Sequence, residues 1–123
     1  MTRTTVTPTG MPAPKSPLSP GVRWGNVLYV SGQTAPEAAG VEAQTRAVLE
    51  KLGAILNAGG TDYANVLRCG VYLSDIRTFE TMNAVYREFF SSAPPARSTI
   101  ECKMADPGIL VEVDCVAGIP ERH

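Results

Sequence analysis

Histidine is almost missing from this sequence: among 123 residues, only His123 at the very end is a histidine. Protein metal sites commonly draw on histidines or clustered cysteines, so a histidine-based metal site is not expected and we predict no metal ligands. A serine–histidine–aspartate triad would depend on a side chain at the chain end, where order is usually poorest. Hydrolysis of that type is therefore not expected either.

Cysteine is also scarce. The three cysteines, Cys69, Cys102 and Cys115, are odd in number and contain no CxxC pair. All three lie in segments with strand-like patterns. We interpret them as free, reduced thiols of a cytoplasmic protein.

Long apolar runs and basic clusters are missing as well. No run approaches the roughly 20 apolar residues of a membrane helix, and residues 1–20 lack the apolar segment of a signal peptide. The 11 basic and 12 acidic residues leave a net charge of −1 without a basic stripe. Such a balance argues against a nucleic-acid footprint, so we expect neither a membrane nor a nucleic acid as partner.

Two helices are predicted from apolar residues that recur at helical spacing. The first covers residues 41–58 and ends at Gly59-Gly60. The second follows Thr78, a candidate N-cap, and is stopped by Pro94-Pro95. Glu80 in its first turn suits the positive end of the helix dipole.

Strands account for most of the remaining chain. Gly25-Asn26 is typical of a two-residue hairpin turn, and it separates strands at 22–24 and 27–31. Other strands are predicted at residues 3–6, 65–75, 97–102 and 109–117. Two helices covering one face of such a sheet make a single α+β domain over residues 1–123, with a proline-rich segment at 1–20 and a tail at 118–123.

Several strands are apolar on both faces. The runs VLYV at 27–30 and ILVEV at 109–113 do not simply alternate. A strand that is apolar on both sides needs cover on both sides, and a third layer is missing from the predicted elements. We therefore expect a homo-oligomer, although scattered exposed apolar residues are common on protein surfaces.

The last two strands carry charges inside apolar runs. If 97–102 and 109–117 form an antiparallel hairpin, Thr99 lies opposite Glu112 and Arg97 opposite Asp114. The charged residues would then share the face away from the helices. One interpretation is a solvated ion pair between Arg97 and Asp114, which stabilises little. The other is an arginine that binds a carboxylate beside a glutamate that moves protons.

At these residues the chain resembles the RidA/YjgF family. The resemblance rests on the order and spacing of VSGQ at 30–33, NAVYREFF at 83–90, PPARSTIE at 94–101 and VEVD at 111–114. It implies the chorismate-mutase-like fold, a mixed sheet with two helices on one face. It also implies a homotrimer with a cleft between each pair of subunits.

The family's characteristic activity is the hydrolysis of 2-imino and enamine acids to 2-keto acids and ammonia, without a cofactor. By the resemblance, Arg97 holds the substrate carboxylate and Glu112 activates water or moves a proton. Ser31 and Gly32 line the cleft. Thr99 takes a cleft position that is commonly cysteine, and Leu18 stands where typical members have a tyrosine.

The departures at Leu18 and Thr99 imply an altered substrate range. One alternative is a specialised catabolic deaminase of an amino-substituted unsaturated acid. Another is a non-catalytic trimer that binds small carboxylates or regulates a partner. Ribonuclease activity, which has also been attached to parts of this family, is disfavoured because metal-free RNA cleavage commonly uses histidines and a positive surface.

Overall fold

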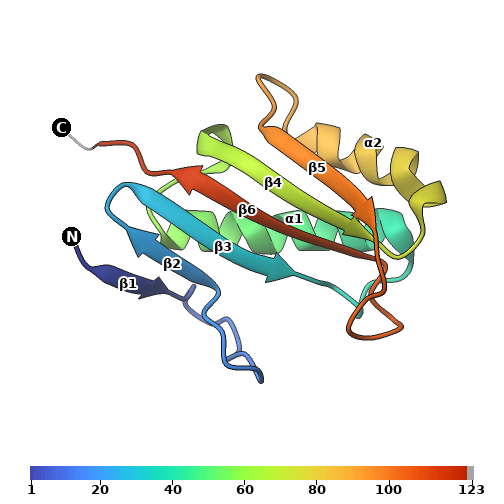
Figure 1. Cartoon of the computed structure of the whole chain (residues 1–123), viewed down its shortest axis with the longest axis horizontal. Helices are drawn as coiled ribbons and strands as arrows, with labels where there is room; N and C mark the ends of the chain where they lie inside the picture. The colour runs from blue at the N-terminus through green and yellow to red at the C-terminus, as the bar shows by residue number, and fades with distance from the viewer. Residues whose placement is uncertain (122–123) are drawn as a thin grey trace.

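The computed structural model describes residues 1–121. It contains one six-stranded mixed sheet in the order β1-β2-β3-β6-β4-β5. Both long helices lie behind this sheet in Figure 1, so the opposite face is left open. The strands are β1 (Arg3–Val6), β2 (Gly21–Trp24), β3 (Val27–Gln33), β4 (Val66–Leu73), β5 (Ala96–Glu101) and β6 (Val111–Gly118). The α+β prediction with two helices on one face is confirmed.

The helices are α1 (Gly40–Ala58) and α2 (Phe79–Phe89), with short 3-10 turns at Tyr63–Asn65 and Ile76–Thr78. The apolar stripe of α1 is fully buried. The helix ends at Ala58, and Gly59 and Gly60 follow it as the predicted stop. Gly60 has a φ of +88°, a conformation that glycine adopts without strain. Neither α1 nor any other described helix has the apolar length that a membrane crossing requires.

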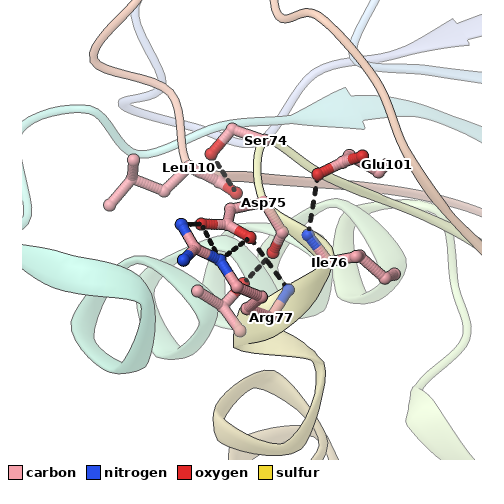
Figure 2. A network of polar contacts seen from close by, with 7 residues as sticks. Ser74, Asp75, Ile76, Arg77, Glu101 and Leu110 are labelled. Atoms are coloured by element: carbon pink, nitrogen blue, oxygen red, sulfur yellow. Dashed lines mark hydrogen bonds and ion pairs between the residues drawn. The ribbon is translucent and has the colours of Figure 1, made fainter.

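A polar network fixes where α2 begins (Figure 2). The carboxylate of Asp75 accepts hydrogen bonds from the backbone and the guanidinium of Arg77, and Glu101 at the end of β5 accepts one from the backbone N–H of Ile76 at 3.1 Å. Thr78 occupies the predicted N-cap position of α2, but its hydroxyl donates to the carbonyl of Asp75 and makes no capping bond to α2. The network therefore ties the start of α2 to the edge strand.

The predicted hairpin between the last two strands is wrong. β5 pairs in parallel with β4, while β6 lies between β3 and β4 and is antiparallel to both. The reason is visible in burial. Every second residue of β6 is buried, which suits a central strand, whereas no residue of β5 is buried, which suits an edge.

The predicted sharing of faces fails with the hairpin. Cys69 of β4 pairs with both Arg97 and Cys115, so these side chains lie on the same face, the one covered by helices. Tyr72 likewise pairs with Glu112, and both point to the open face. Arg97 and Thr99 therefore lie on the opposite face of the sheet from Glu112 and Asp114, and the expected Arg97–Asp114 pair does not form.

The open face carries large apolar side chains. Trp24, Tyr29 and Ile100 keep 50–54% of their surface exposed, and all three lie on this face by their strand pairing. The face that the helices cover contains the core. This distribution matches the sequence-based expectation of strands with two apolar sides, and it leaves the open face without cover from the described residues.

Candidate functional site

Glu112 stands in the middle of β6, on the open face. Its carboxylate packs directly against the backbone of Gly32, so closely that a methyl group at position 32 would overlap with it. Gly32 lies in an irregularity of the β3–β6 pairing between Val30 and Gln33, which brings its backbone toward the carboxylate. The structure thus joins two of the residues predicted for the site.

The environment of Glu112 disfavours its charged form. Partial burial raises the pKa of its carboxyl, and the negative charge of Asp114, two residues on, raises it further. Within residues 1–121, Glu112 forms no ion pair. A half-buried carboxyl with a raised pKa and no cation beside it is suited to taking up and releasing a proton.

Asp114 has a structural role that sequence reasoning missed. Its carboxylate accepts a hydrogen bond from the hydroxyl of Tyr72 at 2.9 Å and another from the backbone N–H of Gly70 at 3.1 Å. The hydrogen bond to Asp114 raises the pKa of Tyr72. The alternation of β4 places Tyr72 on the open face, but only the strand order shows that it lies across from β6.

Arg97 lies on the other side of the sheet, against α2. Its guanidinium stacks over the ring of Tyr86, 4.7 Å from the centroid, and lies 5.5 Å from the ring of Phe79. It forms no ion pair with any carboxylate of residues 1–121. Cation–π stacking orients the guanidinium while leaving its N–H groups available to a carboxylate.

Arg97 lines a cavity of about 280 Å³ between α2 and the loop before β5. Asn83 and Arg87 of α2, together with Pro94 and Pro95, contribute to its wall. Asn83 and Arg87 both belong to the NAVYREFF motif at 83–90, but neither of them was assigned to the site from the sequence. Their spacing of four residues puts them on one side of α2, but the sequence does not indicate that this side faces Arg97.

Thr99 is two residues beyond Arg97 on the same face of β5. Its hydroxyl is buried and has no hydrogen-bond partner among residues 1–121. Buried hydroxyls are nearly always satisfied, so this one is available to a further group. Thr99 pairs with Val71 of β4 and does not lie with Glu112.

Ser31 and Leu18 lie near Gly32, where the proline-rich segment meets the end of β3. The hydroxyl of Ser31 donates to the carbonyl of Ser19 at 2.6 Å, and its backbone N–H donates to the carbonyl of Pro20 at 2.9 Å. Ser31 thus holds the end of the proline-rich segment against β3. Leu18 and Gly32 line a largely apolar cavity of about 520 Å³ under that segment.

The predicted site residues therefore form two groups within one chain. Arg97 and Thr99 lie on the helix face, and Glu112, Gly32, Ser31 and Leu18 lie around the end of β3. Arg97 and Glu112 are separated by one intervening strand and by three residues along it, which puts their Cα atoms about 14 Å apart. Because their side chains also point to opposite faces, a single chain does not bring them onto one small substrate.

No group of three or more metal-ligating side chains gathers within residues 1–121.

Comparison with known proteins identifies the chain's relatives. The family model described as "Endoribonuclease L-PSP" matches residues 9–119. The chain belongs to this family. The RutC family protein SSO3206 of Saccharolobus solfataricus is 40% identical over 113 residues, covering 86% of this chain and 90% of that protein. The RidA/YjgF resemblance is thereby confirmed.

Two further comparisons concern a relative with a named function and a solved structure. Reactive Intermediate Deaminase A, chloroplastic, of Arabidopsis thaliana is 34% identical over 113 residues, which cover 86% of this chain and 60% of that protein. A crystal structure of YyfA, from the Rid protein family of Yersinia pestis, matches with a TM-score of 0.88 and 28% identity, over 96% of this chain and all of that one. The family thus includes a reactive intermediate deaminase.

Proposed function

We propose that this protein is a deaminase that hydrolyses reactive 2-imino and enamine acids to 2-keto acids and ammonia. The observation that carries the proposal is that neither charged residue implied by the resemblance is neutralised within residues 1–121. Arg97 has no carboxylate and Glu112 has no cation. Charges retained at partly buried positions without partners are more typical of ligand-binding groups than of structural ones.

Arg97 would hold the substrate. A planar guanidinium binds a carboxylate through two parallel hydrogen bonds. Stacking on Tyr86 and Phe79 limits its rotation, so less freedom is lost when the carboxylate binds. The 2-carboxylate of the imino acid would thereby be fixed, with the adjacent C=N carbon in a defined position.

Glu112 would handle the protons. As base, its carboxylate takes a proton from water while the water oxygen bonds to the C=N carbon and the π electrons move to nitrogen. Glu112 returns this proton to the nitrogen, which gives the neutral carbinolamine. Glu112 then takes the proton of the carbinolamine hydroxyl while an oxygen lone pair forms the C=O group and the C–N bond breaks. That second proton goes to the departing nitrogen, which leaves as ammonia, so atoms and charges balance and no redox step occurs.

The separation of Arg97 from Glu112 supports an assembled site. We propose a homotrimer in which Arg97 of one copy and Glu112 of its neighbour face the same cleft. The exposed Trp24, Tyr29 and Ile100 on the open face give such an assembly an apolar surface to bury. We also propose that the protein works in the cytoplasm, since its three cysteines are free.

A coupled assay tests the activity. An amino-acid oxidase generates 2-imino acids of several sizes, and semicarbazide traps whatever imine remains. Wild-type protein is expected to lower the yield of trapped imine, whereas Arg97→Ala and Glu112→Gln lose at least about tenfold in this effect. Arg77→Ala is the matched control, because Arg77 is exposed and paired with Asp75.

Equal trapping with and without a folded wild-type trimer would overturn the deaminase. If that trimer still bound small carboxylates, the non-catalytic binding protein would take its place. Turnover of an amino-substituted unsaturated acid alone would favour the specialised catabolic enzyme. Analytical ultracentrifugation tests the assembly: a monomer that retains full activity would contradict the shared site.

The word endoribonuclease in the family's description does not lead us to propose RNA cleavage. The chain has one histidine, at position 123, and a net charge of −1. RNA binding generally requires a basic surface, and metal-free cleavage commonly requires histidine acid–base groups.

A further inference from the structure

The cavity next to Arg97 contains a second arginine. Arg87 of α2 lines the same space of about 280 Å³, together with the amide of Asn83. Arg97 is partly buried and stacked on aromatic rings, whereas Arg87 is exposed at the rim. Arg97 and Arg87 thus line one cavity from different elements, β5 and the last turns of α2.

No carboxylate lines this cavity among residues 1–121. The acidic residue that follows Arg87 in the chain is Glu88, and its carboxylate is bound by Arg46 of α1 at 2.7 Å. Arg87, like Arg97, forms no ion pair within the described residues. Two like charges facing one cavity repel each other unless an anion lies between them.

From this arrangement we propose that the cavity binds a dianion, so that the preferred substrates are short 2-imino dicarboxylates. The inference rests on the proposed deaminase function and narrows its substrate class. Arg97 holds the 2-carboxylate beside the reacting carbon. Arg87 binds the carboxylate at the end of the side chain, and the amide of Asn83 lies in the same wall as a further hydrogen-bond donor.

The size of the cavity agrees with a short substrate. Pockets for drug-sized ligands hold roughly 300–1,000 Å³, and this one lies at the lower limit. The prolines at 94 and 95 form a stiff wall opposite α2. A dicarboxylate with a short side chain is small enough for a cavity of this volume.

Relative turnover of two imines is the first test. Oxidation of L-aspartate supplies 2-iminosuccinate, and oxidation of L-alanine supplies 2-iminopropanoate. The ratio of kcat/KM for the first imine to that for the second is expected to fall about tenfold or more in Arg87→Ala, because a charge-assisted bond to the second carboxylate is lost. Arg77→Ala, which removes an exposed arginine from the 3-10 turn before α2, is expected to leave the ratio unchanged.

Equilibrium binding separates this inference from the deaminase proposal. Succinate and propionate are stable probes, and isothermal titration calorimetry at low salt measures their affinity. We expect succinate to bind about tenfold more tightly than propionate, with the preference lost in Arg87→Ala. Succinate binding that depends on Arg87, without hydrolysis of any imine, would support the dianion cavity and overturn the deaminase.

Two results would overturn the inference. One is a kcat/KM ratio that stays the same in Arg87→Ala while both imines are hydrolysed, which would leave the deaminase in place. The other is equal affinity of wild-type protein for succinate and propionate. Because Arg87 is exposed, its removal is not expected to impair folding, and circular dichroism of each variant checks this.

Discussion

The carboxylate of Glu112 occupies the space that a side chain at Gly32 would need. This contact joins the central strand β6 to the irregular end of β3. It places a partly buried acid against bare backbone. None of the basic residues within 1–121 forms an ion pair with this carboxylate. The absence of a side chain at Gly32 therefore allows the carboxylate of Glu112 to take this position.

Replacing Gly32 by alanine is expected to disable the site without unfolding the protein. The obstructing atoms belong to the end of a flexible side chain, so the carboxylate moves while the backbone stays. Imine hydrolysis should fall roughly ten- to hundredfold, with a loss of stability of about 1 kcal/mol or less. Gly108→Ala is the control, since its new methyl group would meet only Pro36 at an ordinary 3.7 Å. Equal activity of the two variants would contradict this role for Gly32.

The acid side of the pH–activity profile should report Glu112. The raised pKa of this carboxyl means that activity falls, as pH is lowered, at a pH above the usual range of a glutamate. Asp114→Asn removes the neighbouring negative charge and should shift this fall in activity to lower pH. Tyr72→Phe removes a hydrogen bond to Asp114 but keeps the charge of Asp114, so the fall in activity of this variant should stay closer to that of wild type. A fall at the same pH in all three proteins would exclude Glu112 as the titrating group.

Glu112→Gln is expected to lower the activity and to raise the stability of the protein at neutral pH. A pKa that is raised in the folded state means that the folded protein disfavours the ionised carboxylate, so at neutral pH this group subtracts from stability. The neutral amide avoids that cost, and the Tm of the variant at neutral pH should exceed that of wild type. As pH falls through the raised pKa and below 4.5, the wild-type carboxyl is protonated in both states and the difference should close. Thermal unfolding followed across pH checks both statements, and a lower Tm for the variant at neutral pH would refute them.

Ser31 is expected to stabilise the protein by holding the proline-rich segment against β3. Ser31→Ala deletes the 2.6 Å hydrogen bond to the carbonyl of Ser19 and should lower the free energy of unfolding by about 1 kcal/mol. Amide hydrogen exchange of the segment around Leu18 should speed up at the same time. Ser92→Ala, at an exposed serine in the loop before β5, provides the comparison. A loss of activity with unchanged exchange and stability would instead point to direct contact with substrate.

The local structure was largely predictable from the residues. The periodic apolar stripe predicted the first helix at 41–58, and the structure has it at Gly40–Ala58. Gly25-Asn26 correctly marked the turn of the β2–β3 hairpin. Such features follow from propensities and patterns within a few residues, which do not depend on the rest of the chain.

The candidate site was predicted only in part. The motifs led to Arg97, Glu112, Ser31, Gly32, Thr99 and Leu18 as residues of interest, and their functional roles remain predictions. Gly32 and Glu112 do lie together. Arg87 and Tyr72 were missed because their neighbours in the structure are distant in sequence. Arg87 shares a cavity with Arg97, and Tyr72 donates a hydrogen bond to Asp114.

What the sequence by itself determined was the set of elements, the two helices on one face and the family. Only the tertiary structure decided which strands pair, and therefore which face each charge occupies. All strands present the same backbone hydrogen-bonding groups, so their order depends on burial over the whole sheet. β6, in which every second residue is buried, lies in the centre of the sheet, and β5, in which no residue is buried, lies at the edge. That order placed β4 between Arg97 and Glu112 and put their side chains on opposite faces.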